Sequence, residues 1–123
     1  EFLAPGAFEY FLKNKPADFD LYCGTIFDGE TSEDDNRILN GMSATMSLYI
    51  ISKRFYNFIL NEMPDDCHID RYLGDHAFRF KYYVPPYLVC TQRQGYSDNL
   101  KQKTGDYNVY LERRKLFTEI AIQ

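Results

Sequence analysis

Apolar residues at the start of the chain recur at the spacing of one helix face. The segment 4–16 places them three and four positions apart, which predicts a short α-helix. Pro5 suits a first helical turn, and Pro16 ends the segment because the residue before a proline disfavours helical backbone. We therefore expect one apolar face on this helix, made of Phe8, Phe11 and Leu12.

The pattern then changes to that of strands and a longer helix. Residues 18–27 alternate, which predicts a strand with Phe19, Leu21 and Cys23 on one side, and the acidic segment 28–36 predicts a loop. Residues 46–51 are a short apolar run that indicates a buried strand. Ser52 suits the N-cap of a helix that ends at Pro64, with an apolar stripe made of Phe55, Tyr56, Ile59, Leu60 and Met63.

The second half of the chain predicts five further segments. A short helix over 67–75 is stopped by Gly74, and two strands over 78–84 and 87–92 are separated by Pro85 and Pro86. A loop over 93–106 then leads to a terminal helix over 107–122, whose expected buried residues are Tyr110, Leu116, Phe117 and Ile120. Helices and strands mixed in this order predict an α/β fold, with a mixed sheet flanked by helices, in a single domain over residues 1–123.

Composition narrows the class of protein. The 123 residues are 45% hydrophobic and 17% aromatic, which is enough for a folded core, and the net charge of −4 argues against broad nucleic-acid binding. The three cysteines Cys23, Cys67 and Cys90 are odd in number and widely spaced, which predicts free thiols. No apolar run approaches the roughly 18 residues of a membrane span. We expect a cytoplasmic protein with no membrane span.

A cluster of polar side chains lies in the segment PDDCHIDRYLGD, residues 64–75. Asp66, His68 and Asp70 are one candidate metal set, although their spacing is not a standard zinc pattern. Asp65 or Asp66 is alternatively a cap for the short helix. A third hypothesis makes Asp70 a general base or a substrate contact. The composition of the chain and the spacing of these residues leave the three alternatives open.

Three segments together resemble the C-terminal half of the family 25 glycosyltransferases, the lipo-oligosaccharide galactosyltransferase type with a GT-A-like fold. They read SATMSLYIISKRFYNFIL, HIDRYL and YYVPPYLVCTQRQGYSDN, in that order. The matching positions are Gly41–Thr45, Tyr49–Ser52, Ile69–Leu73, Val84–Pro86, Gln92 and Ser97–Asp98. The order and spacing of these pieces fit over about residues 19–99, whereas no single piece is specific.

The resemblance implies an enzyme that transfers a hexose from a nucleotide sugar, a UDP-hexose, to a saccharide acceptor. It places the family's aspartate at Asp70, as the base or the acceptor contact, and we expect no metal ligand in this chain. The substrate-binding candidates that accompany it are Ser43, Thr45, His68, Gln92, Ser97 and Asp98.

The resemblance also implies that the chain is one part of such an enzyme. In the family, a stretch similar to residues 1–22 directly follows an acidic motif that carries the metal and the sugar-nucleotide diphosphate. We therefore expect a fragment without the donor-binding half, inactive in isolation and holding no cofactor itself. A divalent cation such as manganese, with the UDP-sugar, is implied for the full-length parent. Glu33, Asp34 and Asp35 are interpreted as a solvated loop, because a polar segment separates them from the preceding strand.

A different class of function stays open beside the enzyme. The chain is alternatively a non-catalytic binding or structural module with a glycosyltransferase-like fold. An upstream reading frame through a strand that ends in an acidic pair favours the enzyme, and a start codon just before Glu1 favours the module. In either case an exposed sheet edge predicts possible self-association.

Overall fold

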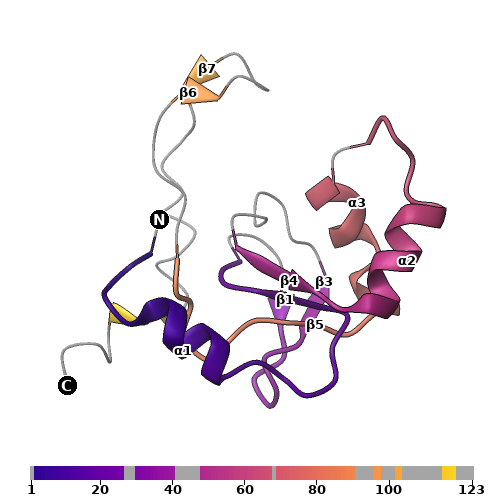
Figure 1. Ribbon diagram of the computed structural model, residues 1–123. Helices are drawn as coiled ribbons and strands as arrows, with labels where there is room; N and C mark the ends of the chain where they lie inside the picture. Colours follow the sequence, from indigo (N-terminus) through magenta and orange to yellow (C-terminus); the bar gives the residue numbers. More distant parts are fainter. Residues whose placement is uncertain are drawn as a thin grey trace.

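The structure is a computed structural model, and it describes residues 2–26, 30–40, 48–67, 69–90, 96–97, 102–103 and 115–118 (Figure 1). Its helices are α1 (Ala7–Lys13), α2 (Lys53–Glu62), α3 (Ile69–Asp75) and the 3₁₀ helix η1 (Ala77–Arg79). Its strands are β1 (Leu21–Cys23), β2 (Glu30–Thr31), β3 (Ile38–Asn40), β4 (Tyr49–Ile51), β5 (Tyr82–Tyr83), β6 (Tyr96–Ser97) and β7 (Gln102–Lys103).

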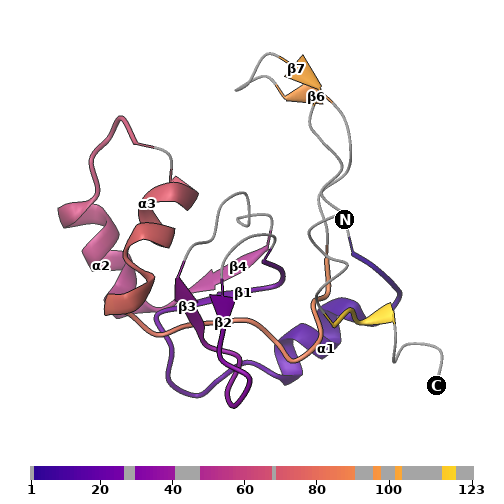
Figure 2. The same ribbon diagram turned by 180° about the vertical axis from the view of Figure 1, so that it is seen from behind.

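A three-stranded mixed sheet in the order β4-β1-β5 lies at the centre of the fold. Strand β1 pairs antiparallel with β4, where Tyr22 faces Ile50, and parallel with β5, where Tyr22 faces Tyr83. Figures 1 and 2 show α1 to one side of this sheet and α2 with α3 to the other. The predicted α/β class, with a mixed sheet and flanking helices, is confirmed at this level.

Both faces of β1 are buried, which the alternating sequence pattern did not predict. Leu21 and Cys23 belong to one core cluster, together with Phe55 of α2 and Leu73 of α3. Tyr22 points to the opposite face and belongs to a second cluster that includes residues of α1. Because helices cover both faces, Tyr22 is buried on the side of the strand opposite to Leu21 and Cys23.

Helix α1 forms where it was predicted but buries a different face. Its buried residues are Ala7 and Phe11, and the Phe11 ring stacks on Tyr22 with the ring centroids 4.3 Å apart. Phe8 and Leu12 are 44% and 45% exposed, so only Phe11 of the predicted apolar face is in the core. The helix turns one row of residues towards the sheet, and the row beside it stays at the surface.

Helix α2 begins at its predicted cap, since Ser52 Oγ accepts a hydrogen bond from Phe55 N at 3.3 Å. Phe55 is buried, whereas Tyr56 and Leu60 are 53% and 64% exposed, so the predicted stripe is only partly a core face. Helix α3 was also predicted, but Gly74 lies inside it and it ends at Asp75.

Strands also lie in two segments that were predicted as loops. The predicted acidic loop 28–36 contains β2, which pairs antiparallel with β3 just after that loop, and the turn between them places Asn36 at a φ of 61°. Strands β6 and β7 pair antiparallel inside the predicted loop 93–106. The predicted strand 78–84 is shorter, because η1 occupies its start.

Residues 115–117, which were predicted to be helical, pair with Leu88 instead, and the rest of the predicted terminal helix lies outside the described residues. Leu88 N donates to Lys115 O and Phe117 N donates to Leu88 O, each at 2.8 Å. Phe117 is buried as predicted and packs in the cluster that contains Tyr22, and Leu116 is partly buried. Tyr110 and Ile120 lie outside the described residues. The predicted strand 87–92 is represented by isolated pairings, of Leu88 with Leu116 and of Cys90 with Phe2.

Candidate functional site

The structure places the main candidate, Asp70, in the first turn of α3. Ser97 lies in β6, where it pairs with Gln102. For both residues the backbone is described and the side chain is not. The remaining candidates lie outside the described residues: Ser43, Thr45, His68, Gln92 and Asp98.

Aromatic contacts fix the helix that carries Asp70 against α2. The Tyr72 ring stacks on Phe58, with the centroids 6.4 Å apart, and its hydroxyl donates to Glu62 O at 3.3 Å. One turn later, His76 Nδ1 lies 2.8 Å from Tyr72 O. Leu73 of the same helix is fully buried in the core. The backbone at Asp70 is therefore part of a packed helix pair.

The other motif segments lie on elements next to this pair. Tyr49–Ile51 forms β4, and Ser52 caps α2 while its backbone N–H donates to Asp20 O at 3.0 Å. Phe55 of α2 contacts Tyr82 of β5 in an edge-to-face arrangement. The segments that were separate in the sequence are thus joined through the β4-β1-β5 sheet and α2.

A buried carboxylate, Asp20, was not among the candidates. It is 7% exposed, and its two oxygens accept hydrogen bonds from Arg54 Nε at 2.6 Å and from Lys81 N at 2.8 Å. Asp18 lies outside it and forms ion pairs with Arg54, at 2.9 Å, and with Lys81. The Lys81 hydrogen bond, helped by Arg54, lowers the pKa of Asp18. The hydrogen bond to Asp20 raises the pKa of Arg54.

The cluster of Asp18, Asp20, Arg54 and Lys81 stabilises the fold. Both oxygens of Asp20 are used by donors of the protein, and the contacts tie the start of β1 to α2 and β5. A carboxylate held in this way is poorly available to take a proton from a substrate. The alternation in ADFDLY gave no signal for this burial, because it put Asp20 on the side opposite to Phe19, Leu21 and Cys23.

Acidic residues elsewhere in the described ranges do not gather into a metal site. Glu33, Asp34 and Asp35 are exposed in the turn between β2 and β3, and Asp35 Oδ1 accepts from Arg37 N at 3.2 Å, so the predicted solvated acidic loop is confirmed. Among the described residues, no group of three His, Cys, Asp or Glu side chains is arranged to hold a metal ion. His68 is outside those residues, so the metal hypothesis for Asp66, His68 and Asp70 stays untested.

The three cysteines are free thiols, as expected. Cys23 is fully buried in the core, and burial raises its pKa to about 12. Cys90 is also buried, whereas Cys67 is partly exposed and its Sγ lies 3.1 Å from Pro64 O. A thiol with so high a pKa as that of Cys23 carries almost no thiolate at neutral pH and is a poor nucleophile.

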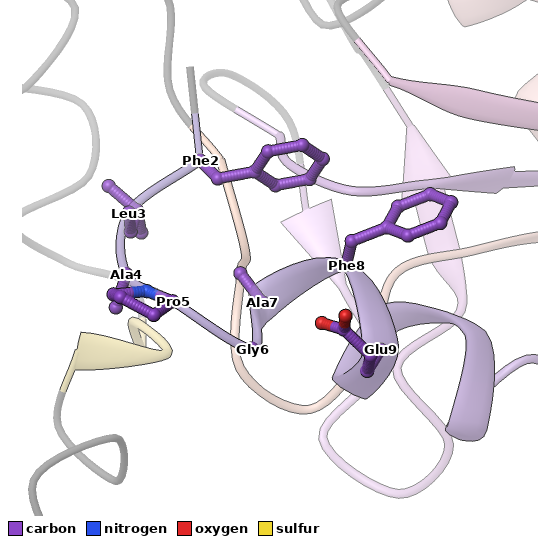
Figure 3. Close-up of a pocket in the computed structure, with 8 residues that line it drawn as sticks. All are labelled: Phe2, Leu3, Ala4, Pro5, Gly6, Ala7, Phe8 and Glu9. Carbon is purple, nitrogen blue, oxygen red and sulfur yellow. The ribbon is translucent and has the colours of Figure 1, made fainter.

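A shallow hollow lies at the start of α1, away from the predicted site residues (Figure 3). It has a volume of about 390 Å³ and is lined by Phe2, Leu3, Ala4, Pro5, Gly6, Ala7, Phe8 and Glu9. The rings of Phe2 and Phe8 meet edge to face, with centroids 5.8 Å apart. This feature was not predicted, because Phe8 was expected to belong to one apolar face of the helix together with Phe11.

The chain matches no model of a protein family, no curated protein and no solved structure. The resemblance to glycosyltransferases therefore depends on the motifs themselves. In the described part of the chain, no helix has the length and apolar character needed to cross a membrane.

Proposed function

We propose that this chain is the acceptor-side half of a nucleotide-sugar-dependent glycosyltransferase that is related to family 25 and has a GT-A-like fold. The complete enzyme would be cytoplasmic and would transfer a hexose to a saccharide acceptor. One observation carries the proposal. The motif segments Tyr49–Ser52 and Ile69–Leu73 lie on β4, the α2 cap and α3, which pack around one mixed sheet.

In this proposal Asp70 supplies the base. Its carboxylate takes the proton from the acceptor hydroxyl as the hydroxyl oxygen attacks the anomeric carbon of the donor and the nucleotide leaves. The packing of α3 against α2, through Tyr72 and Phe58, supports this role, because a base has to be held still relative to its substrate. Ser43, Thr45, His68, Gln92, Ser97 and Asp98 are proposed to bind the sugars.

The UDP-sugar and its divalent cation are assigned to the donor-binding half of the enzyme. Among the described residues of this chain, no cluster of three side chains is arranged to hold a metal ion. When bound in the donor half, manganese would neutralise charge on the leaving diphosphate.

The proposal is tested by assaying the complete polypeptide that carries this chain, with UDP-galactose and UDP-glucose, manganese and a panel of oligosaccharide acceptors. We expect a product larger than the acceptor by one hexose, detected by mass spectrometry. The isolated 123-residue chain is expected to form none. Absence of transfer and of donor hydrolysis in the complete polypeptide would favour the non-catalytic binding module.

A further inference from the structure

We infer that the hollow lined by residues 2–9 is a binding subsite for a saccharide, with Phe2 and Phe8 packing on the apolar face of a sugar ring and Glu9 accepting hydrogen bonds from its hydroxyls. This sugar is a second ligand, distinct from the acceptor hydroxyl that Asp70 would deprotonate, so the inference goes beyond the proposed function. The hollow is separate from Asp70 in the sequence and lies at the opposite side of the sheet from α3 (Figure 1).

The two aromatic rings supply an exposed apolar surface for a sugar ring. Phe2 and Phe8 are 47% and 44% exposed, although large aromatic side chains are normally buried. Figure 3 shows both rings on the same side of the segment, and they meet at an interplanar angle of 68°. The face of an aromatic ring is electron-rich and attracts C–H groups, which are what one face of a hexose presents.

A carboxylate beside the rings supplies the polar part of the site. Glu9 follows Phe8 in α1, is exposed, and lines the same hollow. An ionised carboxylate only accepts hydrogen bonds, and sugar hydroxyls are donors. At about 390 Å³ the hollow lies near the lower end of ligand-site volumes, roughly 300–1,000 Å³, which suits one or two sugar rings better than a long chain.

The backbone under the rings is held in place by long-range contacts. Leu3 N donates to Val89 O at 2.9 Å, and Phe2 pairs with Cys90. Ala7 is buried, and the left-handed turn at Gly6, with φ 86°, leads directly into the helix. A ligand that binds here orders little of the protein, so little of the interaction energy is lost to conformational entropy.

Leu12 is the residue that distinguishes sugar binding in the hollow from non-specific apolar contact along α1. It lies one turn after Phe8, is equally exposed at 45%, and does not line the hollow. A protein partner that covers the apolar side of α1 would contact both residues. A sugar in the hollow would contact Phe8 and require an aromatic ring there, which leucine cannot replace.

The test is a titration of the ¹⁵N-labelled 123-residue chain with lactose, galactose and glucose, followed by NMR amide shifts and by saturation transfer to the sugar. We expect at least one sugar to bind with shifts centred on residues 2–9. Phe8→Ala and Phe8→Leu should each weaken binding about five- to tenfold, and Phe8→Tyr and Leu12→Ala should leave it nearly unchanged. Glu9→Gln should weaken binding several-fold. Thermal melting of each variant checks that the fold is retained.

Three results would overturn the inference: no sugar binds, Phe8→Leu binds as well as the parent, or Leu12→Ala weakens binding as much as Phe8→Ala. The last result, accompanied by a change in sedimentation, would mean that α1 carries a protein interface. Asp70→Asn separates this inference from the proposed function. Sugar binding retained in that variant, with or without transfer by the complete polypeptide, supports the subsite independently of the chemistry.

Discussion

Asp20 and Arg54 are 34 positions apart in the chain, and their side chains meet at 2.6 Å between Oδ1 and Nε. The second oxygen of Asp20 accepts from the backbone N–H of Lys81, and the Asp20 carbonyl accepts from Ser52 N. One residue at the start of β1 therefore fixes the neighbouring strand β5 and the junction between β4 and α2. The proposed sugar-transfer residue on α3 depends on this framework because α3 packs on α2.

Replacing Asp20 tests this dependence. Asp20→Asn should lower the free energy of unfolding by about 2 kcal/mol, because an amide cannot accept from Arg54 with the same charge and its NH₂ group meets another donor. Urea unfolding monitored by circular dichroism measures the change. Asp18→Asn is the matched control, since Asp18 contacts the same Arg54 but is exposed, and its stability should stay close to that of the parent. Equal losses in the two variants would contradict the role assigned to Asp20.

The lowered pKa of Asp18 predicts a direction for the pH dependence of stability. Because the folded state binds this proton less readily than the unfolded state, the ion pairs stabilise the fold above the ordinary pKa of 3.8. That contribution is lost as the pH falls below this value and through the lower pKa of the folded state. Asp18→Asn should flatten the curve of stability against pH only below about pH 4. A difference between variant and parent that grows above pH 5 would contradict the assignment.

Two buried tyrosines should respond differently to removal of the hydroxyl. Burial raises the pKa of Tyr22 and Tyr82, so both phenols stay neutral. Tyr22 donates to Phe11 O at 2.8 Å, whereas the buried Tyr82 hydroxyl has no hydrogen-bond partner in the described structure. Tyr22→Phe should cost about 1 kcal/mol, and Tyr82→Phe should be neutral or stabilise by up to about 1 kcal/mol. A loss at Tyr82→Phe equal to that at Tyr22→Phe would indicate a bound water on its hydroxyl.

The sequence predicted the elements whose signal is local. Ser52 is a cap because its hydroxyl accepts from the N–H of Phe55 only three residues later, and α1, α2, α3 and β4 were all recognised. The burial of Tyr22 and the exposure of Phe8 depend on which side of the sheet each helix covers, and a pattern along one segment does not contain that information. The pairing of Leu88 with residues 115–117 is also non-local, so the prediction of helix for these three residues was wrong.

The candidate site also divides into features with a local sequence signal and features that depend on distant residues. The motif around Asp70 was located on a short helix from its spacing and from Gly74, which lies one residue before the helix end. Asp20 was missed because its importance comes from Arg54 and Lys81, which no local pattern connects to it. The hollow at residues 2–9 was missed because aromatic residues at helical spacing usually indicate a core face.

Thiol labelling tests the burial of the cysteines. Cys23 and Cys90 are buried and Cys67 is partly exposed, so one thiol per native chain should react quickly with a small disulfide reagent at pH 8. The pKa of about 12 keeps Cys23 protonated under these conditions. All three thiols should react in denaturant. A Cys67→Ser variant that still shows one fast thiol would contradict the described core.

The most direct test of the proposed function is the rate of hexose transfer by the Asp70→Asn variant of the complete polypeptide. The change keeps the shape of the side chain and removes the proton acceptor, so kcat should fall about 10²–10⁴-fold while donor binding stays nearly intact. Asp66→Asn is the control, because Asp66 is an exposed carboxylate four residues earlier, and it should keep its activity. Full transfer activity in Asp70→Asn would contradict the assignment of the base, and it would leave this segment as a polar connection between two packed helices.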